Sequence, residues 1–108
     1  MRCYLLLANK ENGEKERFSF DIKTSYAMRL IKDVGLYGVC YLLYDPREKQ
    51  IIEKGNIHRI DYYEEEQKYQ AFFEEQVVLK HALDIEMCEN NTIIPLNMSE
   101  IKKMGVAI

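Results

Sequence analysis

The sequence predicts a two-layer α+β domain with a mainly antiparallel sheet and helices on one face. Three observations lead to this prediction. An apolar run at residues 35–44 has the composition of a buried strand, alternating apolar residues flank an Asn-Gly pair near the N-terminus, and helical periodicity occupies residues 26–34. Hairpins joined to helices are typical of a sheet covered by helices. The expected order is β-β-α-β-β-α, with a further β-β-α if residues 84–96 form a hairpin.

The length and composition of the chain indicate one globular domain. It has 108 residues, of which 47% are hydrophobic and 31% charged. We therefore treat residues 1–108 as a single domain. No run approaches the roughly 18 apolar residues of a membrane-spanning helix. The three cysteines are odd in number and widely separated, which favours a reduced, cytoplasmic protein without membrane association.

A hairpin is predicted at the N-terminus, where Asn12-Gly13 lies between two runs of alternating apolar residues. An Asn-Gly pair favours a two-residue type I′ turn, and such a turn sets the register of the two strands. One face of the hairpin is then apolar from end to end, because the facing pairs are Leu7 with Phe18, Leu5 with Phe20 and Cys3 with Ile22.

A helix and a buried strand are predicted next. Thr24 or Ser25 can cap the helix, and Gly35 can end it in the left-handed conformation. The residues at helical spacing form an apolar stripe that leaves Asp33 off it: Tyr26, Ala27, Leu30, Ile31 and Val34. We expect this helix to lie across the apolar face of the first hairpin. The run from Gly35 to Tyr44 then forms a strand that is buried on both faces.

The middle of the chain predicts one more strand and the longest helix. Residues 50–60 form the strand. Ile52 and Ile60 are at even positions and Ile57 is at an odd one, which indicates a bulge or an early end of pairing at Gly55-Asn56. Apolar residues then recur three and four positions apart, which favours a helix from Tyr62 to about Ala82. Asp61 and Glu64 resemble a capping box at the start of this helix.

Residues 84–96 allow two interpretations. Residues 84–88 and 92–96 can form a further hairpin in which Pro95 places its strand at a sheet edge, or the long helix can continue to Cys88. A short final helix is predicted from Ser99 to Met104, with Gly105 as its end. A second copy of the chain can pair with an edge of such an open sheet, so a homodimer is also considered.

Negative charge is concentrated in the predicted long helix and the segment after it. Residues 61–89 contain nine acidic residues and only two basic ones. Clustered carboxylates attract a basic partner, and tyrosine often anchors protein interfaces. The predicted partner-binding residues are Tyr62, Tyr63, Glu64, Glu65, Glu74 and Glu75.

The sequence contains no pattern that predicts catalysis, metal binding or a cofactor. Both histidines are isolated, and the five glycines form no phosphate-binding loop. The prediction is therefore a small non-enzymatic binding protein, acting as a regulator, adaptor or inhibitor, whose protein partner has a basic surface. Two alternatives stay open. One is a small-molecule sensor or enzyme with a pocket between sheet and helices; the other is a nucleic-acid-binding module on the hairpin of residues 35–60, using Lys49, Lys54, Arg59 and Tyr44.

Overall fold

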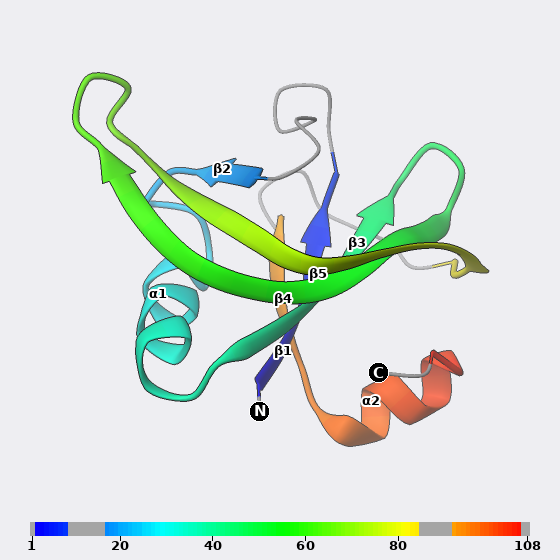
Figure 1. The fold of residues 1–108 in the computed structure, drawn as a ribbon. Helices are drawn as coiled ribbons and strands as arrows, with labels where there is room; N and C mark the ends of the chain where they lie inside the picture. The colour runs from blue at the N-terminus through cyan, green and yellow to red at the C-terminus, as the bar shows by residue number, and fades with distance from the viewer. Residues whose placement is uncertain (1, 9–16, 85–91, 107–108) are drawn as a thin grey trace.

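A computed structural model of the protein describes residues 2–8, 17–84 and 92–106, which form a curled sheet with two helices (Figure 1). In sheet order the strands are β2, β5, β4, β3, β1 and β6. Among the strands of these described residues, only β1 and β3 are parallel neighbours, so the prediction of a mixed α+β fold with a mainly antiparallel sheet is confirmed. The elements are β1 (Arg2–Leu7), β2 (Arg17–Phe20), α1 (Ala27–Leu36), β3 (Val39–Asp45), β4 (Gln50–Tyr63), β5 (Lys68–Ala82), β6 (Ile93–Leu96) and α2 (Met98–Met104).

The predicted N-terminal hairpin is wrong. β1 lies between β3 and β6, whereas β2 pairs with β5 at the other edge of the sheet. The register that placed Leu7 opposite Phe18 therefore does not occur, and the Asn12-Gly13 turn lies outside the described residues. Cys3, Tyr4, Leu5 and Leu6 are all buried. A strand that is buried on both faces belongs in the interior of a sheet, where parallel pairing is common. The predicted hairpin would have left one face of this strand exposed to solvent.

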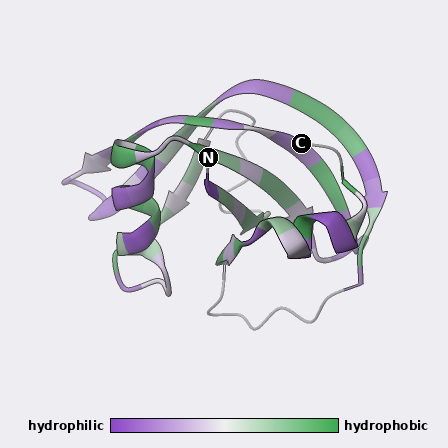
Figure 2. Ribbon diagram, turned by 90° about the horizontal axis from the view of Figure 1, so that it is seen from below, coloured by the Kyte–Doolittle hydropathy of each residue, from purple (hydrophilic) through white to green (hydrophobic). Residues whose placement is uncertain are grey.

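The first predicted helix is confirmed as α1, but both of its predicted ends are wrong. The N-cap is Tyr26, in a left-handed conformation and without a side-chain capping bond, instead of Thr24 or Ser25. The helix continues through Gly35, and the residue with positive φ after it is Gly38. Asp33 was expected off the apolar stripe, yet it is buried with Ala27 and Leu30. Figure 2 shows both hydrophilic and hydrophobic residues along α1, as an amphipathic helix requires.

The predicted strand of residues 35–44 corresponds to β3, which is buried on both faces for most of its length. β4 follows it, and the predicted bulge at Gly55 is present. Lys54 pairs with Val77 and Asn56 with Glu74, so that Gly55 faces two residues of β5. One of these is Glu75, whose φ of 54° is left-handed. An extra residue on one strand bends the pair, and Figure 1 shows the β4–β5 hairpin curving across the molecule.

The predicted long helix at residues 62–82 is wrong, because this segment completes β4 and forms β5. Bulges account for the misleading spacing. Tyr69 and Phe73 pack in one core cluster, whereas Leu79 and Leu83, which are also at odd positions, pack in the other. An extra residue at a bulge moves all later side chains to the opposite face of the sheet. The inward residues of a bulged strand therefore lose the strict period of two that identifies a strand.

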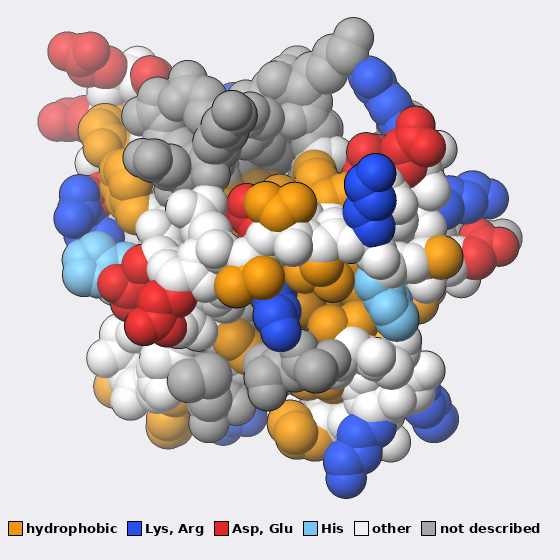
Figure 3. Space-filling model, turned by 45° about the vertical axis from the view of Figure 1, so that its right-hand side comes forward, with side chains coloured by type: hydrophobic (Ala, Val, Ile, Leu, Met, Phe, Trp, Pro, Cys, Tyr) orange, Lys and Arg blue, Asp and Glu red, His pale blue; other side chains and the backbone are white. Residues whose placement is uncertain are grey.

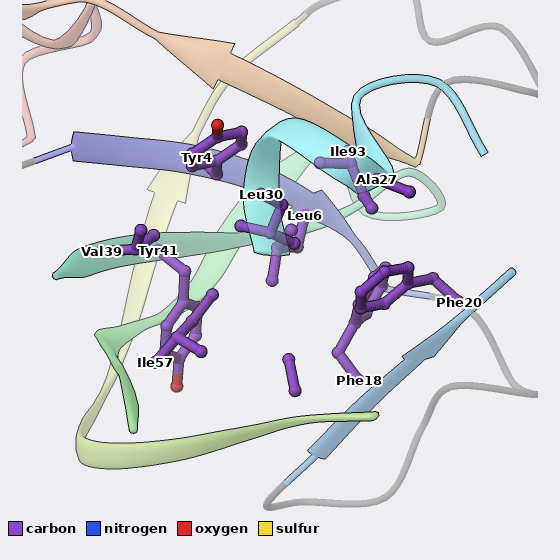
Figure 4. Close-up of a cluster of buried hydrophobic side chains, with 11 residues drawn as sticks. Tyr4, Leu6, Phe18, Phe20, Ala27, Leu30, Val39, Tyr41, Ile57 and Ile93 are labelled. Carbon is purple, nitrogen blue, oxygen red and sulfur yellow. The ribbon is translucent and has the colours of Figure 1, made fainter. Parts of the chain in front are cut away.

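The core consists of two clusters on opposite faces of the sheet, so the expectation of helices on one face is wrong. α1 packs on one face and α2 on the other. The α1 cluster, whose side chains converge in Figure 4, contains Tyr4, Leu6, Phe18, Phe20, Ala27, Leu30, Val39, Tyr41, Ile57, Ala71 and Ile93. The α2 cluster contains Cys3, Leu5, Cys40, Leu42, Tyr44, Ile51, Ile101 and Val106. A helix is needed on each face because β1 and β3 carry large apolar side chains on both faces.

The C-terminal elements agree with the prediction where the structure describes them. Pro95 lies in the edge strand β6, and α2 ends at Gly105, which has a φ of 76°. Asn97 caps α2 in a capping box with Glu100. Residues 85–91, on which the two interpretations of residues 84–96 differed, lie outside the described residues; β6 itself pairs with β1. Neither α1 nor α2 has the length and apolar character that a membrane crossing requires.

Gly55→Ala should destabilise the protein by roughly 1–3 kcal/mol, the usual range for overpacking a tight site. A Cβ atom at Gly55 would lie 2.9 Å from the backbone oxygen of Glu74 and 3.0 Å from the ring of Tyr41. The free energy of unfolding in urea measures the effect.

Gly35→Ala is the matched control, because a Cβ atom there meets nothing within 4 Å and the residue lies in α1. This substitution should stabilise the protein by roughly 0.5–1 kcal/mol, since alanine loses less backbone freedom in a helix than glycine. Equal effects of the two substitutions would contradict the close packing at the bend.

Candidate functional site

The β4–β5 hairpin ends in an exposed acidic and aromatic tip. The hairpin tip, as we call residues 62–67, contains the last two residues of β4 and a four-residue turn. Tyr62 is 51% exposed and Tyr63 is 37% exposed. The turn closes with a hydrogen bond from the Gln67 backbone N–H to the carbonyl of Glu64, and Gln67 has the left-handed φ of 53°. Four of the six predicted partner-binding residues are therefore neighbours here: Tyr62, Tyr63, Glu64 and Glu65.

A series of aromatic contacts joins the hairpin tip to the core. The Tyr62 ring lies 4.8 Å from that of Tyr69, its partner across the hairpin. Tyr69 lies 5.8 Å from Phe20 on β2, and Phe20 lies 6.1 Å from Phe18. Aromatic pairs at these distances contribute about 0.5–1.5 kcal/mol beyond the area that they bury. Tyr62 is therefore held in position although half of its surface is exposed.

Negative charge dominates the hairpin tip. Glu64, Glu65 and Glu66 are all exposed, and Lys68 follows them as the first residue of β5. Figure 3 shows acidic side chains projecting at the upper left, toward the side where the hairpin turn lies in Figure 1. Exposed like charges on one turn create a local negative potential that extends about one Debye length, roughly 8 Å at physiological salt.

Glu74 and Glu75, the other two predicted partner-binding residues, lie apart from the hairpin tip at the bend of β5. The Glu74 Oε2 atom is 3.2 Å from the Nδ1 atom of His58. The Glu75 Oε2 atom accepts a hydrogen bond of 2.6 Å from the side-chain amide of Asn56. Both carboxylates thus contact side chains of β4. The single acidic helix face that the sequence predicted is replaced by two separate groups of acidic residues.

The residues of the nucleic-acid alternative do not form one basic surface. Lys49 lies in the β3–β4 turn, with its Nζ atom 3.4 Å from Asp84. The Nε atom of Arg59 lies 2.9 Å from Asp61, and its guanidinium lies over the ring of Phe72. Lys54 lies between these two positions on β4.

Tyr44 is not available to stack on a base, contrary to its predicted role. Only 1% of the residue is exposed, and its hydroxyl donates a hydrogen bond of 2.7 Å to the carbonyl of Leu83. The strand alternation of β3 places it in the α2 cluster.

Two pairs of a buried tyrosine and a carboxylate were missed in the sequence. The Tyr41 hydroxyl donates a hydrogen bond of 2.6 Å to Glu53, and the Tyr4 hydroxyl donates one of 2.6 Å to Asp33. Burial, and then the neighbouring carboxylate, raise the pKa of each tyrosine above its ordinary value. A usable signal existed for Asp33, because it follows Ala27 and Leu30 at intervals of three and so shares their helix face.

Two of the three cysteines lie in the described part of the chain, as neighbours in the sheet. Cys3 and Cys40 face each other on the parallel strands β1 and β3, and both are buried. The hydrogen bond with Cys40 and burial raise the pKa of Cys3, whereas the hydrogen bond with Cys3 lowers the pKa of Cys40. Within residues 2–8, 17–84 and 92–106, no three His, Cys, Asp or Glu residues are grouped so that they could hold a metal ion.

The Tyr41–Glu53 pair should make the stability of the protein fall at high pH. An unfolded tyrosine loses its proton near pH 10. Tyr41 keeps its proton in the folded state at this pH. Its contribution to the free energy of unfolding is therefore complete below about pH 10 and is lost as the pH rises toward the raised pKa of the folded state. Tyr41→Phe should make this fall shallower, which urea unfolding between pH 8 and pH 11 would measure.

The control for Tyr41→Phe is Tyr37→Phe, which removes a hydroxyl group from an exposed ring. If Tyr41→Phe and the unmodified protein lost stability with the same pH dependence, the raised pKa of Tyr41 would be contradicted.

Comparisons of this chain with protein families, with curated proteins and with solved structures found no match. The chain's own surface and contacts are therefore the basis for a proposal about its function.

Proposed function

We propose that this chain is a non-enzymatic binding protein that contacts a basic surface of a protein partner through the hairpin tip. The observation that carries the proposal is the exposure of Tyr62 and Tyr63 directly beside three exposed carboxylates. A regulator, adaptor or inhibitor needs a surface of this kind and no catalytic group. The proposed surface keeps four of the six residues expected from the sequence and moves them from a helix to a hairpin turn.

The two tyrosines supply the apolar part of the contact. Tyrosine is enriched among the residues that contribute most to protein interfaces, because it offers a large area with few rotatable bonds. Tyr62 already contacts Tyr69 in the free protein. Little side-chain freedom is then lost when a partner covers it, which favours binding.

The carboxylates supply attraction and specificity. Glu64, Glu65 and Glu66 lie on a turn at the end of a long hairpin, where a partner can approach without touching the rest of the sheet (Figure 1). Complementary charge mainly speeds association and selects the partner, and salt weakens it. Binding to the proposed partner should therefore weaken as salt is added. Part of the affinity should persist at high salt, because the apolar contacts of the tyrosines are not screened.

The test is capture of partners from the native cells with the tagged protein, with and without nuclease, followed by affinity measurement with the purified partner. The variant Tyr62→Ala with Glu64→Lys and Glu65→Lys should weaken binding at least about 30-fold, since truncating a central interface tyrosine alone often costs about 2 kcal/mol. The melting temperature should fall by only a few degrees, because Tyr62→Ala removes the ring contact with Tyr69, worth about 0.5–1.5 kcal/mol, whereas Glu64 and Glu65 are exposed.

The matched control is Glu48→Lys, a charge reversal in the exposed β3–β4 turn at the other end of β4. It should leave partner binding unchanged. Equal binding by the hairpin-tip variant and the unmodified protein would overturn the proposal. Recovery of nuclease-sensitive material alone would also overturn it, in favour of nucleic acid.

A further inference from the structure

A cavity of about 400 Å³ lies at the N-terminal end of β1, between α1, β6 and the start of α2. It lies on the β1–β6 side of the sheet, away from the β4–β5 hairpin tip, so it is independent of the function proposed above. Volumes of roughly 300–1,000 Å³ are typical of small-molecule sites. The polar lining residues that bear on its chemistry are Arg2, Tyr4, Arg29, Asp33, Asn97 and Glu100.

A buried carboxylate forms part of the cavity wall. Asp33 is only 7% exposed, and it is the one buried charged residue among those that the structure describes. Its Oδ2 atom accepts the hydrogen bond from Tyr4 and lies 3.9 Å from the Nε atom of Arg29. Removing a carboxylate from water is unfavourable, and a leucine here would extend the apolar face that Ala27 and Leu30 begin. A few polar groups that converge on a largely apolar pocket are typical of small-molecule sites.

Tyr4 is oriented to serve the same cavity. Figure 4 shows its hydroxyl pointing away from the other side chains of the α1 cluster, although its ring belongs to that cluster. The hydroxyl uses its proton in the bond to Asp33. Its oxygen can still accept a hydrogen bond, so Tyr4 and Asp33 together present acceptors to a donor group in the cavity.

Two arginines from different elements supply positive charge. Arg29 lies on α1 with its side chain 52% exposed, and the guanidinium of Arg2 on β1 lies 4.9 Å from the centre of the Tyr37 ring. Guanidinium groups suit carboxylates because they offer parallel N–H donors. The lining also contains Glu100, which accepts a hydrogen bond from the Asn97 backbone. Positive and negative groups are therefore balanced in the lining.

We propose that this cavity binds a small zwitterion, specifically a free α-amino acid. Its carboxylate lies against the guanidinium groups of Arg29 and Arg2, and its ammonium group donates to Asp33 and to the Tyr4 oxygen. Without a ligand, Arg29 and Asp33 contact each other. An anion that took the place of Asp33 beside Arg29 would leave the buried Asp33 carboxylate without a positive partner, and an unpaired buried charge lowers affinity; a zwitterion supplies a partner to both groups.

The test is titration of the full chain with each standard amino acid at millimolar concentration, by calorimetry and by thermal shift. At least one amino acid should bind saturably and raise the melting temperature in proportion to the logarithm of its concentration above Kd. Acetate and methylammonium, which each carry one of the two charges, should bind at least ten-fold more weakly. No binding of any amino acid, or equal binding of acetate, would overturn the proposal.

Arg29→Gln should weaken amino-acid binding at least ten-fold. The variant should fold, because the Arg29 side chain is 52% exposed and Asp33 keeps the hydrogen bond from Tyr4. Lys32→Gln, on an exposed side chain of α1 that does not line the cavity, is the matched control and should bind normally. Unchanged binding by Arg29→Gln would overturn the assignment. The double variant Glu64→Lys with Glu65→Lys should also bind the amino acid normally. Loss of partner binding at the hairpin tip can then be distinguished from loss of amino-acid binding at the cavity.

Discussion

The close approach of the Tyr41 ring to Gly55 is the contact on which the shape of the sheet depends. Tyr41 lies beside the bulge where β4 and β5 bend, and it stacks on Phe73 at 3.9 Å. A side chain at residue 55 would occupy the space that the ring and the Glu74 carbonyl fill. Because the bend changes which face later residues occupy, one pair of long strands contributes to both core clusters. The same bend sends the end of the hairpin away from the core and exposes its tip.

Burial of β1 and β3 on both faces requires a helix on each side, and this requirement also explains the buried polar groups. The tyrosines of β1 and β3 are too long to end within the apolar clusters. Tyr4 and Tyr41 therefore direct their hydroxyl groups to Asp33 and Glu53. Each pair satisfies a polar atom that would otherwise be buried without a partner, and such satisfied pairs favour one arrangement of the core. The Tyr4–Asp33 pair borders the cavity described above, and Glu53 also accepts a hydrogen bond from Gln76.

The two proposed sites use the fold in different ways. The hairpin tip is an extension of the sheet whose side chains are exposed and yet held by aromatic contacts with β2 and β5. The cavity lies between α1 and the ends of β1, β6 and α2, and its polar side chains come from segments far apart in the sequence. Of the two, only the hairpin tip could be found in the sequence, because Tyr62, Tyr63, Glu64 and Glu65 are consecutive. The contact between Tyr4 and Asp33 depends on how α1 packs on β1.

The sequence by itself determined the elements whose signals are local. The run in β3, the apolar face of α1, the bulge at Gly55, the edge position of Pro95 and the end of α2 at Gly105 each follow from residues within a few positions of one another. Only the tertiary structure decided the partners of β1 and β2, the strand at residues 68–82 and the placement of helices on both faces. Strand pairing depends on backbone N–H and C=O groups that all residues except proline carry alike, so the sequence does not identify which strands pair. Bulges also shift the period of two, which made β5 resemble a helix, and packing then selected the strand.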